Sequence, residues 1–394
     1  FSTDPIRPVR DGDWLKADGT TLGADNGIGV AAMLAVLESD DVAHGPLELL
    51  FTIDEETGLT GARNLSAGLL EGRLLVNLDS EEEGVVTIGC AGGGDSVLRL
   101  PLVEAGAPGG RGLRVSVGGL KGGHSGVDIH LQRGNAIRIL ARALLAGLDT
   151  TGARIVALEG GNARNAIPRE ASAVVWLSGD VDAAEFRESV EASFALAARE
   201  LARSDPGFRY EIDEAPTSGT AWDETSSRRL LELLNALPHG VMAMSLDLPG
   251  LVETSVNLAV TRPENGRQFV MQHCRSSIGG SLEALRRRVR SVAALAGAEV
   301  AQGPAYPAWQ PDVDSALLAL IRSTYEDVIG EPPDVGAMHA GLECGIIGEK
   351  YEGMDMVSFG PRIEFPHSPD ERVRIGSVGP FFEVLTRTLE RVDG

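Results

Sequence analysis

The runs LELLFTID (residues 47–54), LLVNLDS (residues 74–80) and VVTIGC (residues 85–90) are short and mostly apolar, a pattern that favours buried β-strands. A further apolar run at residues 28–37 precedes them and favours a helix. Alternation of such strands and helices predicts a sheet covered by helices. In sheets of this kind, polar residues at the carboxyl ends of the strands tend to form the functional site. Because the first two runs end in polar or acidic residues, we expect the site there.

The middle of the chain has a different character. Gly- and Pro-containing stretches at 91–94 and 105–112 indicate a linker. The elements that we then predict are a strand (113–117), a helix (135–148), two strands (154–158, 171–177), a helix (183–203), a strand (208–213), a helix (226–237), a hairpin (254–260 and 268–275, turned at Asn265-Gly266), a helix (282–296) and a strand (299–302). This order partly repeats, as in two successive α+β units.

After Trp309 the α/β character returns, with helices expected at 314–329 and 378–392 and a strand at 355–359. The predicted fold is therefore an α/β catalytic domain with a central mixed sheet flanked by helices, interrupted by a large inserted α+β lid domain. We assign residues 1–92 and 309–394 to the catalytic domain and residues 93–308 to the lid.

The composition limits which binding partners and which cellular compartment fit the chain. The formal net charge of −22 over 394 residues disfavours nucleic acid and anionic membranes as partners and suits metal ions or amines. Three widely spaced cysteines without a C-x-x-C motif make a disulfide framework improbable and predict a cytoplasmic protein. No apolar run reaches the roughly 18–20 residues that a membrane span requires.

Four segments place acids or a histidine where strands end or helices begin: Gly23–Gly27 (GADNG), Thr52–Gly58 (TIDEETG), Asn77–Ser80 (NLDS) and Pro366–Asp370 (PHSPD). Aspartate, glutamate and histidine without thiolate suit catalytic zinc, manganese or cobalt, and do not suit a structural zinc. A pair of metals about 3.5–4 Å apart requires a shared carboxylate. One further acid should remain free of metal, to accept a proton from the attacking water.

Each segment also has an ordinary structural interpretation. Asp25 could cap a helix, Glu55 and Glu56 could belong to a solvated loop, and His367 could be a rigid loop residue between prolines. In the middle of the chain, the glycines around His124 could simply form a turn, and Arg275 could make a surface ion pair. The combination of segments is far more specific than any one of them.

Taken together, these runs resemble the aminoacylhistidine dipeptidases, which belong to a wider family of two-zinc peptidases that includes carboxypeptidase G, the aminoacylases and the carnosinases. The resemblance covers essentially the whole chain. The runs that carry it, in chain order, are GTTLGADNGIG, TIDEETG, NLDSEEEG, KGGHSG, RNAIPRE, HAGLECG and PHSPDE.

The resemblance implies two divalent metal ions per subunit, with zinc expected and manganese or cobalt as alternatives. It implies that Asp25 bridges both metals, that Glu56 and His367 ligate one of them, and that Asp79 ligates the other. Glu55 would be the general base and later the acid for the leaving amine. The Asp25–Asn26 peptide bond is expected to be cis.

For the lid, the resemblance implies that His124 steadies the oxyanion or the substrate carboxylate. Asn165 and Arg275 would help to bind that carboxylate, and Gly341 would offer backbone contact to the substrate. The roles of His339 and Glu343 stay open. We also expect the lid to close over the substrate, with hinges near 91–94 and 304–309.

The chain departs from the family pattern in one respect. The wider family takes a metal ligand from an early His-x-Asp segment, and none of the seven histidines here begins one. By the resemblance, roughly 90 further residues would precede Phe1 and supply that ligand to the metal held by Asp79. We accordingly expect residues 1–394 alone to hold two metals poorly.

Three functions fit the sequence. The first is metal-dependent hydrolysis of unblocked dipeptides, including Xaa-His and carnosine-like substrates, by a cytoplasmic enzyme that is expected to be a homodimer. The second is an N-acyl amino acid deacylase, which would not need a free substrate amine. The third is a non-catalytic pseudopeptidase that serves as a binding module. Retention of the acids and His367 argues against the third function, and the absent His-x-Asp is the argument for it.

Overall fold

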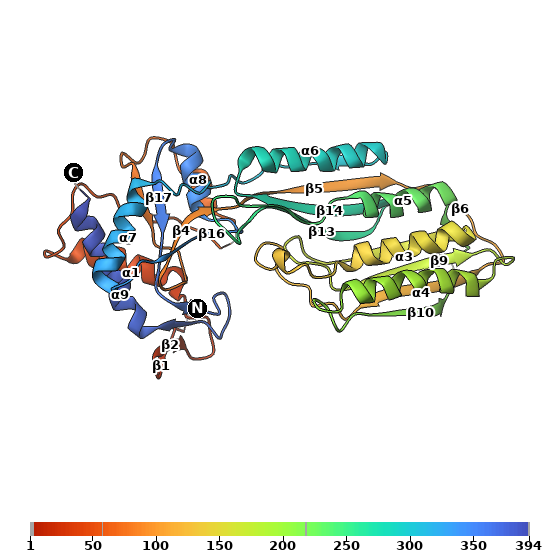
Figure 1. Cartoon of the computed structure of the whole chain (residues 1–394), viewed down its shortest axis with the longest axis horizontal. Coiled ribbons are helices and arrows are strands. Elements are labelled where there is room, and N and C mark those ends of the chain that lie inside the picture. Colours follow the sequence, from red (N-terminus) through yellow and green to blue (C-terminus); the bar gives the residue numbers. More distant parts are fainter. Residues whose placement is uncertain (1–3, 57, 217–218, 393–394) are drawn as a thin grey trace. The chain divides into compact units, whose positions relative to one another are not determined.

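The computed structural model (Figure 1) describes residues 4–56, 58–216 and 219–392. Phe1 and Thr57, which the sequence analysis used, lie outside the described residues. The chain forms two compact units, one of Phe1–Ala91, Leu246–Leu251 and Pro307–Gly394 and one of Gly92–Ser245 and Val252–Tyr306. Each unit is described by itself. In the described part of the chain, no helix has the length and apolar character to cross a membrane.

The first unit is built on a four-stranded mixed sheet in the order β16-β4-β17-β3. β16 runs parallel to β4 and β17 runs parallel to β3, whereas β17 and β4 pair in antiparallel fashion. Its strands are β3 (Leu74–Asn77), β4 (Val85–Cys90), β16 (Asp334–Met338) and β17 (Asp355–Ser358). Its helices are α1 (Ala24–Glu38), α2 (Thr60–Asn64), α7 (Ala316–Ile329), α8 (Glu343–Lys350) and α9 (Ile375–Arg391).

The core of this unit lies between the sheet and its helices. Ile88 on β4 and Val357 on β17 are buried against Ile321 of α7 and Val384 of α9. Ala32 and Val36 of α1 and Leu78, which follows β3, belong to the same hydrophobic cluster, so the packed core supports both the start of α1 and the residues after β3.

A second, smaller sheet in the first unit carries the loop that contains His367. Its strand order is β1-β2-β19-β18, all antiparallel. The strands are β1 (Pro8–Asp11), β2 (Trp14–Ala17), β18 (Ile363–Glu364) and β19 (Arg372–Arg374). The pairing of β18 with β19 brings both ends of the intervening loop together.

The strand predicted at 47–54 is wrong, because these residues are not in a strand. A strand requires neighbours for its backbone groups, and this segment belongs to no ladder among the described strands. Its expected burial also fails, since Phe51 is 46% and Ile53 73% exposed. Leu47, Leu49 and Phe51 instead line a cavity.

The second unit contains one nine-stranded sheet. The order is β10-β7-β9-β8-β13-β14-β5-β15, with β12 paired to β13. The strands are β5 (Gly92–Pro101), β7 (Arg111–Gly118), β8 (Arg154–Gly160), β9 (Ala171–Leu177), β10 (Arg209–Ala215), β12 (Gly240–Met244), β13 (Val252–Glu264), β14 (Arg267–Ser276) and β15 (Glu299–Ala301). The two successive α+β units suggested by the sequence are thus joined in a single sheet through β8 and β13.

Helices pack on this sheet as Figure 1 shows, with α6 along β5 and β14 and with α3 and α4 beside β7, β9 and β10. They are α3 (Ala136–Thr151), α4 (Ala183–Glu200), α5 (Glu224–Ala236) and α6 (Gly279–Leu295), and a short pair of strands, β6 (Glu104–Gly106) and β11 (Thr220–Trp222), forms a separate ribbon. Asn265 and Gly266 both have positive φ, as the predicted β13–β14 turn requires.

The two predicted linker stretches, 91–94 and 105–112, are also partly wrong. Gly92–Gly94 begin β5, and Glu104–Gly106 form β6. Glycine is needed at the start of β5 because a side chain at 93 would meet Tyr306 and one at 94 would meet Arg286. The glycines therefore mark close packing here, and not a flexible connection.

Candidate metal and peptidase site

Asp25 stands at the start of α1, where the backbone is held from outside the helix. The fully buried carboxylate of Glu371 accepts hydrogen bonds from the N–H groups of Gly23 (2.7 Å) and Asp25 (3.0 Å). The N–H of Gly29 donates to Asn26 Oδ1 (3.1 Å), so Asn26 caps the regular part of the helix. The Asp25 carboxylate is therefore not used as a cap. The Asp25–Asn26 peptide is cis, which confirms the prediction.

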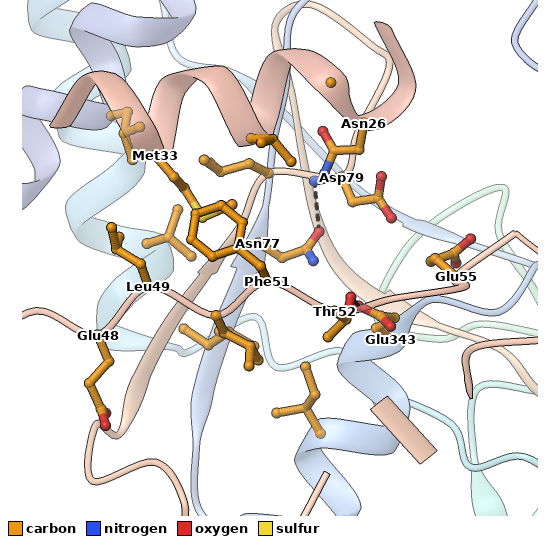
Figure 2. A pocket seen from close by; sticks show the side chains of 18 of the residues that line it. Asn26, Met33, Glu48, Leu49, Phe51, Thr52, Glu55, Asn77, Asp79 and Glu343 are labelled. Atoms are coloured by element: carbon orange, nitrogen blue, oxygen red, sulfur yellow. Dashed lines mark hydrogen bonds between the residues drawn. The ribbon is translucent and has the colours of Figure 1, made fainter. Parts of the chain in front are cut away.

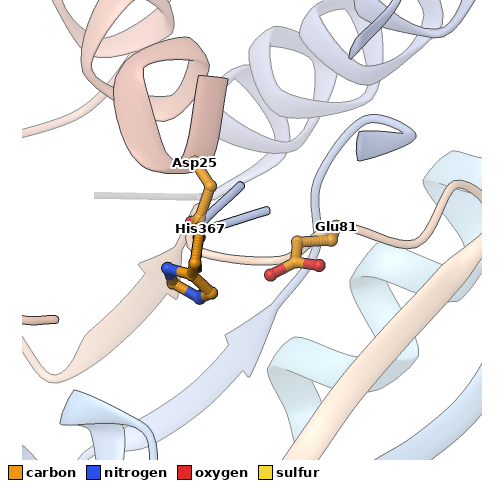
Figure 3. Close-up of side chains that lie close together, drawn as sticks. All are labelled: Asp25, Glu81 and His367. Atoms are coloured by element: carbon orange, nitrogen blue, oxygen red, sulfur yellow. Dashed lines mark ion pairs between the residues drawn. The ribbon is translucent and has the colours of Figure 1, made fainter. Parts of the chain in front are cut away.

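His367 lies next to Asp25, on the loop between β18 and β19. Its Nε2 is 3.7 Å from Asp25 Oδ2, and its Nδ1 is 3.2 Å from Glu56 Oε2. Potential ligand atoms of Asp25, His367 and Glu81 all lie within 4.8 Å of one another (Figure 3). The structure thus brings together Asp25, Glu56 and His367, three of the predicted ligands.

Glu81 is a member of this cluster that the sequence analysis missed. It is the third residue of Asp79-Ser80-Glu81, so an alternation of side chains after β3 was the available signal. Its neighbour Glu83 instead forms an ion pair with Arg374 at 2.9 Å.

Asp79, the fourth predicted ligand, follows β3 and shares a cavity of about 440 Å³ with Asp25, Glu55 and Glu343. Figure 2 shows Asp79, Glu55 and Glu343 at one end of this cavity and Met33, Leu49 and Phe51 at the apolar end. The Asp79 N–H donates to Asn77 Oδ1 (3.0 Å), which orients the turn after the strand.

Glu343, whose role the sequence left open, begins α8 and is buried. Its Oε2 accepts a hydrogen bond from the Thr52 hydroxyl (2.7 Å), and its Oε1 is buried without a partner in the described part of the chain. Gly341 lies just before this helix, in the loop after β16, and His339 is buried in the same loop.

Burial and mutual repulsion raise the pKa values of the carboxyl groups in this cluster. Burial, then the charges of Glu56 and Glu343, raises the pKa of Glu55 to about 7. Burial, then the charges of Asp25 and Glu55, raises the pKa of Asp79 to about 8. Burial and the charge of Asp25 raise the pKa of Glu81 to about 7. A bound cation would favour the ionised form of carboxylates crowded in this way.

The donor set fits divalent metal ions. Carboxylate oxygens and an imidazole converge on one space, which suits zinc or manganese at a catalytic site. The three cysteines are buried and unpaired, and none of them belongs to the group of possible ligands among the described residues. The chemistry of the residues therefore agrees with a metal centre built around Asp25.

The remaining predicted residues lie in the second unit, where two loops are joined. The Ser125 N–H donates to the carbonyl oxygen of Asn165 (2.7 Å), and His124 forms a β-bridge with Ala166. The exposed Asn165 side chain is thereby held near the His124 turn. Gly122 and Gly123 have positive φ, so the turn interpretation of these glycines is correct as well.

The hydrogen bonds of His124 fix its tautomer. Its Nδ1 accepts N–H groups from Gly126 (3.3 Å) and Val127 (3.1 Å). A ring nitrogen that accepts carries no proton, so the neutral ring is protonated at Nε2 and presents a donor there. Burial, followed by the charge of Arg275, lowers the pKa of His124 and favours this neutral form.

Arg275 lies on β14 and is only 6% exposed, so the surface ion pair considered from the sequence is wrong. Its only hydrogen bond among the described residues runs from Nη1 to the Tyr306 hydroxyl (2.9 Å), and no described carboxylate forms an ion pair with it. A buried guanidinium without an anionic partner is the signature of an anion-binding position.

Comparison with known proteins adds the family. Residues 2–391 match the model of peptidase family M20/M25/M40. The chain belongs to this family. Members of the family are metal-dependent peptidases.

Two relatives are similar over the whole chain. The cytosol non-specific dipeptidase of Escherichia coli (strain K12) is 42% identical over 397 residues, which cover 100% of this chain and 81% of the relative. The crystal structure of aminoacylhistidine dipeptidase from Vibrio alginolyticus has 44% identity and a TM-score of 0.93, and the match covers 100% of this chain and 80% of that one. Aminopeptidase PepT from Bacillus cereus, at 17% identity and a TM-score of 0.53 over 98% of this chain and 76% of that one, shares the fold.

We expect the metal-free M20 chain to lose stability as the pH rises, because its site carboxyls have higher pKa values in the folded state than in the unfolded state. Such a group stabilises the fold below its unfolded pKa, and this contribution is lost as the pH passes through the folded pKa. For Glu55 and Asp79 the window runs from the ordinary values of 4.5 and 3.8 up to about 7 and about 8.

Thermal unfolding at several pH values, with and without Zn²⁺ or Mn²⁺, tests this expectation. The metal-free midpoint should fall toward pH 8, and metal should restore most of the loss there. The control is Asp25→Asn, which removes the shared negative neighbour and should flatten the fall. A metal-free midpoint that does not decrease over this window would contradict the interpretation of the cluster.

Proposed function

We propose that this chain is a dipeptidase that hydrolyses unblocked dipeptides, including Xaa-His, with zinc as the metal. The observation that supports this most strongly is the position of His367, whose ring lies 3.7 Å from Asp25 and 3.2 Å from Glu56 and whose ligand atoms form a group with those of Asp25 and Glu81. The similarity to two dipeptidases over the full chain supports the substrate class.

The metal roles follow from the positions of the carboxylates. Asp25 would bridge two ions, Glu56 and His367 would complete one site, and Asp79 would hold the other. When bound, the ions would polarise the scissile carbonyl and lower the pKa of the attacking water. The two hydrogen bonds that Glu371 accepts from the N–H groups of Gly23 and Asp25 keep the Asp25 backbone in place, and the Asp25 carboxylate would act as a ligand.

Glu55 is the proposed general base. It lies in the same cavity as Asp79 but outside the group of atoms around His367. It would take a proton from the attacking water and then give that proton to the leaving amine. One residue would therefore serve as base in the first step and as acid in the second. Glu343, close to Glu55, has one oxygen held by Thr52 and would help to keep the pKa of Glu55 high.

The second unit supplies the groups that recognise the rest of the substrate. The Nε2–H of His124 would donate to the carbonyl oxygen as it becomes negative. The buried charge of Arg275 and the exposed amide of Asn165 would bind the C-terminal carboxylate. Gly341 would contact the substrate through its backbone.

Glu81 would provide the preference for a free amine. Its carboxylate belongs to the cluster with Asp25 and His367, and the ligand assignment above leaves it free to face the substrate. A carboxylate placed there would attract the α-ammonium group of a dipeptide. It would gain no such attraction from an N-acyl substrate, whose nitrogen is uncharged. This assignment favours a dipeptidase over an N-acyl amino acid deacylase.

Substitution of the two adjacent glutamates should separate proton transfer from metal binding. Glu55→Gln should lower kcat by at least about 100-fold with metal content near that of the unaltered protein, because a proton shuttle is lost. Glu56→Gln should lower the metal content itself. The measurements are hydrolysis of an Xaa-His dipeptide and metal analysis of each protein. Undiminished kcat in Glu55→Gln would refute the role of Glu55.

Glu81→Gln should raise KM for a dipeptide by about tenfold, the effect of one charge-assisted hydrogen bond, without loss of metal. The same dipeptide blocked by N-acetylation should show little further change, and Glu82→Gln is the matched control. If Glu81→Gln lowers the metal content, the residue is a ligand and the assignment to the amine is wrong. Equal hydrolysis of free and N-acetylated substrates by the unaltered protein would favour the deacylase.

A further inference from the structure

Arg275 has an unusual partner for a buried guanidinium. Of its five N–H donors, one reaches the Tyr306 hydroxyl, and its Nε is buried with no partner in the described part of the chain. Burial lowers the pKa of Arg275, followed by a raising effect of Tyr306. Because a hydroxyl is neutral, this contact orients the guanidinium without forming an ion pair.

The position of Tyr306 depends on a glycine of the neighbouring strand. Arg275 on β14 faces Gly93 on β5 in the sheet register. Gly93 and Tyr306 exchange two backbone hydrogen bonds, N–H of Gly93 to O of Tyr306 (3.1 Å) and the reverse (2.9 Å). A Cβ at Gly93 would overlap the Tyr306 hydroxyl. The absence of a side chain at Gly93 therefore admits the phenol to the face of the sheet on which Arg275 lies.

The acid on the neighbouring strand, Asp95, already has other partners. Asp95, two residues along β5, accepts a hydrogen bond from His273 Nδ1 (2.6 Å) and lies 3.5 Å from Arg164 Nη1. The His273 side chain is 2% exposed and its Nε2 is buried without a partner among the described residues. Asp95 thus serves His273 and Arg164, and its carboxylate makes no ion pair with Arg275.

We propose that Tyr306 is the residue that positions Arg275 for the C-terminal carboxylate of the dipeptide, through a neutral hydroxyl that leaves the guanidinium charge for the substrate. This inference rests on the proposed function of Arg275. It adds that Tyr306 makes binding depend on a free carboxylate in the substrate. Asp95 completes the arrangement, because its carboxylate is held by His273 and Arg164 and acts on Arg275 without an ion pair.

The test compares a dipeptide with its C-terminal amide in Tyr306→Phe. Loss of the hydroxyl should raise KM for the dipeptide by about tenfold, the effect of one hydrogen bond to a charged group, and should leave kcat nearly unchanged. The amide, which offers no carboxylate to Arg275, should bind weakly to both proteins and should not change. Gly93→Ala should give the same pattern, because its Cβ displaces the phenol.

Tyr210→Phe is the matched control, since Tyr210 lies in the same unit and stacks on Phe194 with ring centroids 4.6 Å apart. It should change neither substrate. An equal change for dipeptide and amide in Tyr306→Phe would mean a merely structural role, and no change for the dipeptide would overturn the proposal outright.

Calorimetric binding of both compounds in a Glu55→Gln background distinguishes this proposal from the proposed function. If the unaltered protein does not hydrolyse the dipeptide, the proposed function fails, yet preferential binding of the free carboxylate that depends on Tyr306 would still support the positioning role. If the Glu55→Gln protein binds the dipeptide and its amide equally well, with or without Tyr306→Phe, the positioning role fails even when the unaltered protein hydrolyses the dipeptide.

Discussion

The contact between the buried Glu371 carboxylate and the N–H groups of Gly23 and Asp25 is the constraint on which the site depends. It joins the loop after β18 to the start of α1, two segments separated by more than three hundred residues in the sequence. A buried charge is stable only when it is paired or hydrogen-bonded, so these N–H groups stabilise Glu371. The Glu371 carboxylate in turn gives the N–H groups their hydrogen-bond acceptor. The result is a fixed backbone from which Asp25 projects toward His367.

The second consequence is electrostatic. Once Asp25 is fixed, its charge acts on Glu56, Asp79 and Glu81, and their pKa values rise through burial and through this repulsion. Such an arrangement destabilises the fold at neutral pH unless cations balance it. Metal binding and the structure of the first unit are therefore two aspects of the same charge balance. In the second unit the balance is inverted, because Arg275 is a buried cation whose hydrogen bond runs to a neutral hydroxyl.

Local patterns in the sequence predicted much of the fold. The strand Val85–Cys90 and the helical run at 28–37, which Asn26 caps, follow from local patterns of apolar and capping residues. The strand at 47–54 was predicted wrongly because a strand also needs neighbours, which a single run does not reveal. β5 was missed because Gly92–Gly94 suggest a linker unless Tyr306 and Arg286 are known to pack against them.

The candidate site shows the same division. Asp25, Glu56 and His367 could be proposed from motifs, and the structure brings them together. Glu81, Glu371 and Tyr306 could not, because their importance lies in contacts with residues distant in the sequence. The buried, unpaired state of Arg275 was likewise invisible, since its strand position alone suggested an exposed ion pair.

The central claim is that the carboxylates around Asp25 form a divalent metal centre. Anomalous diffraction from crystals grown with Zn²⁺, collected on both sides of the zinc absorption edge, tests it most directly. The account predicts an ion in contact with the Asp25 carboxylate, with Glu56 and His367 as its other protein ligands. A zinc-saturated crystal with no anomalous peak within coordination distance of Asp25 would contradict the account.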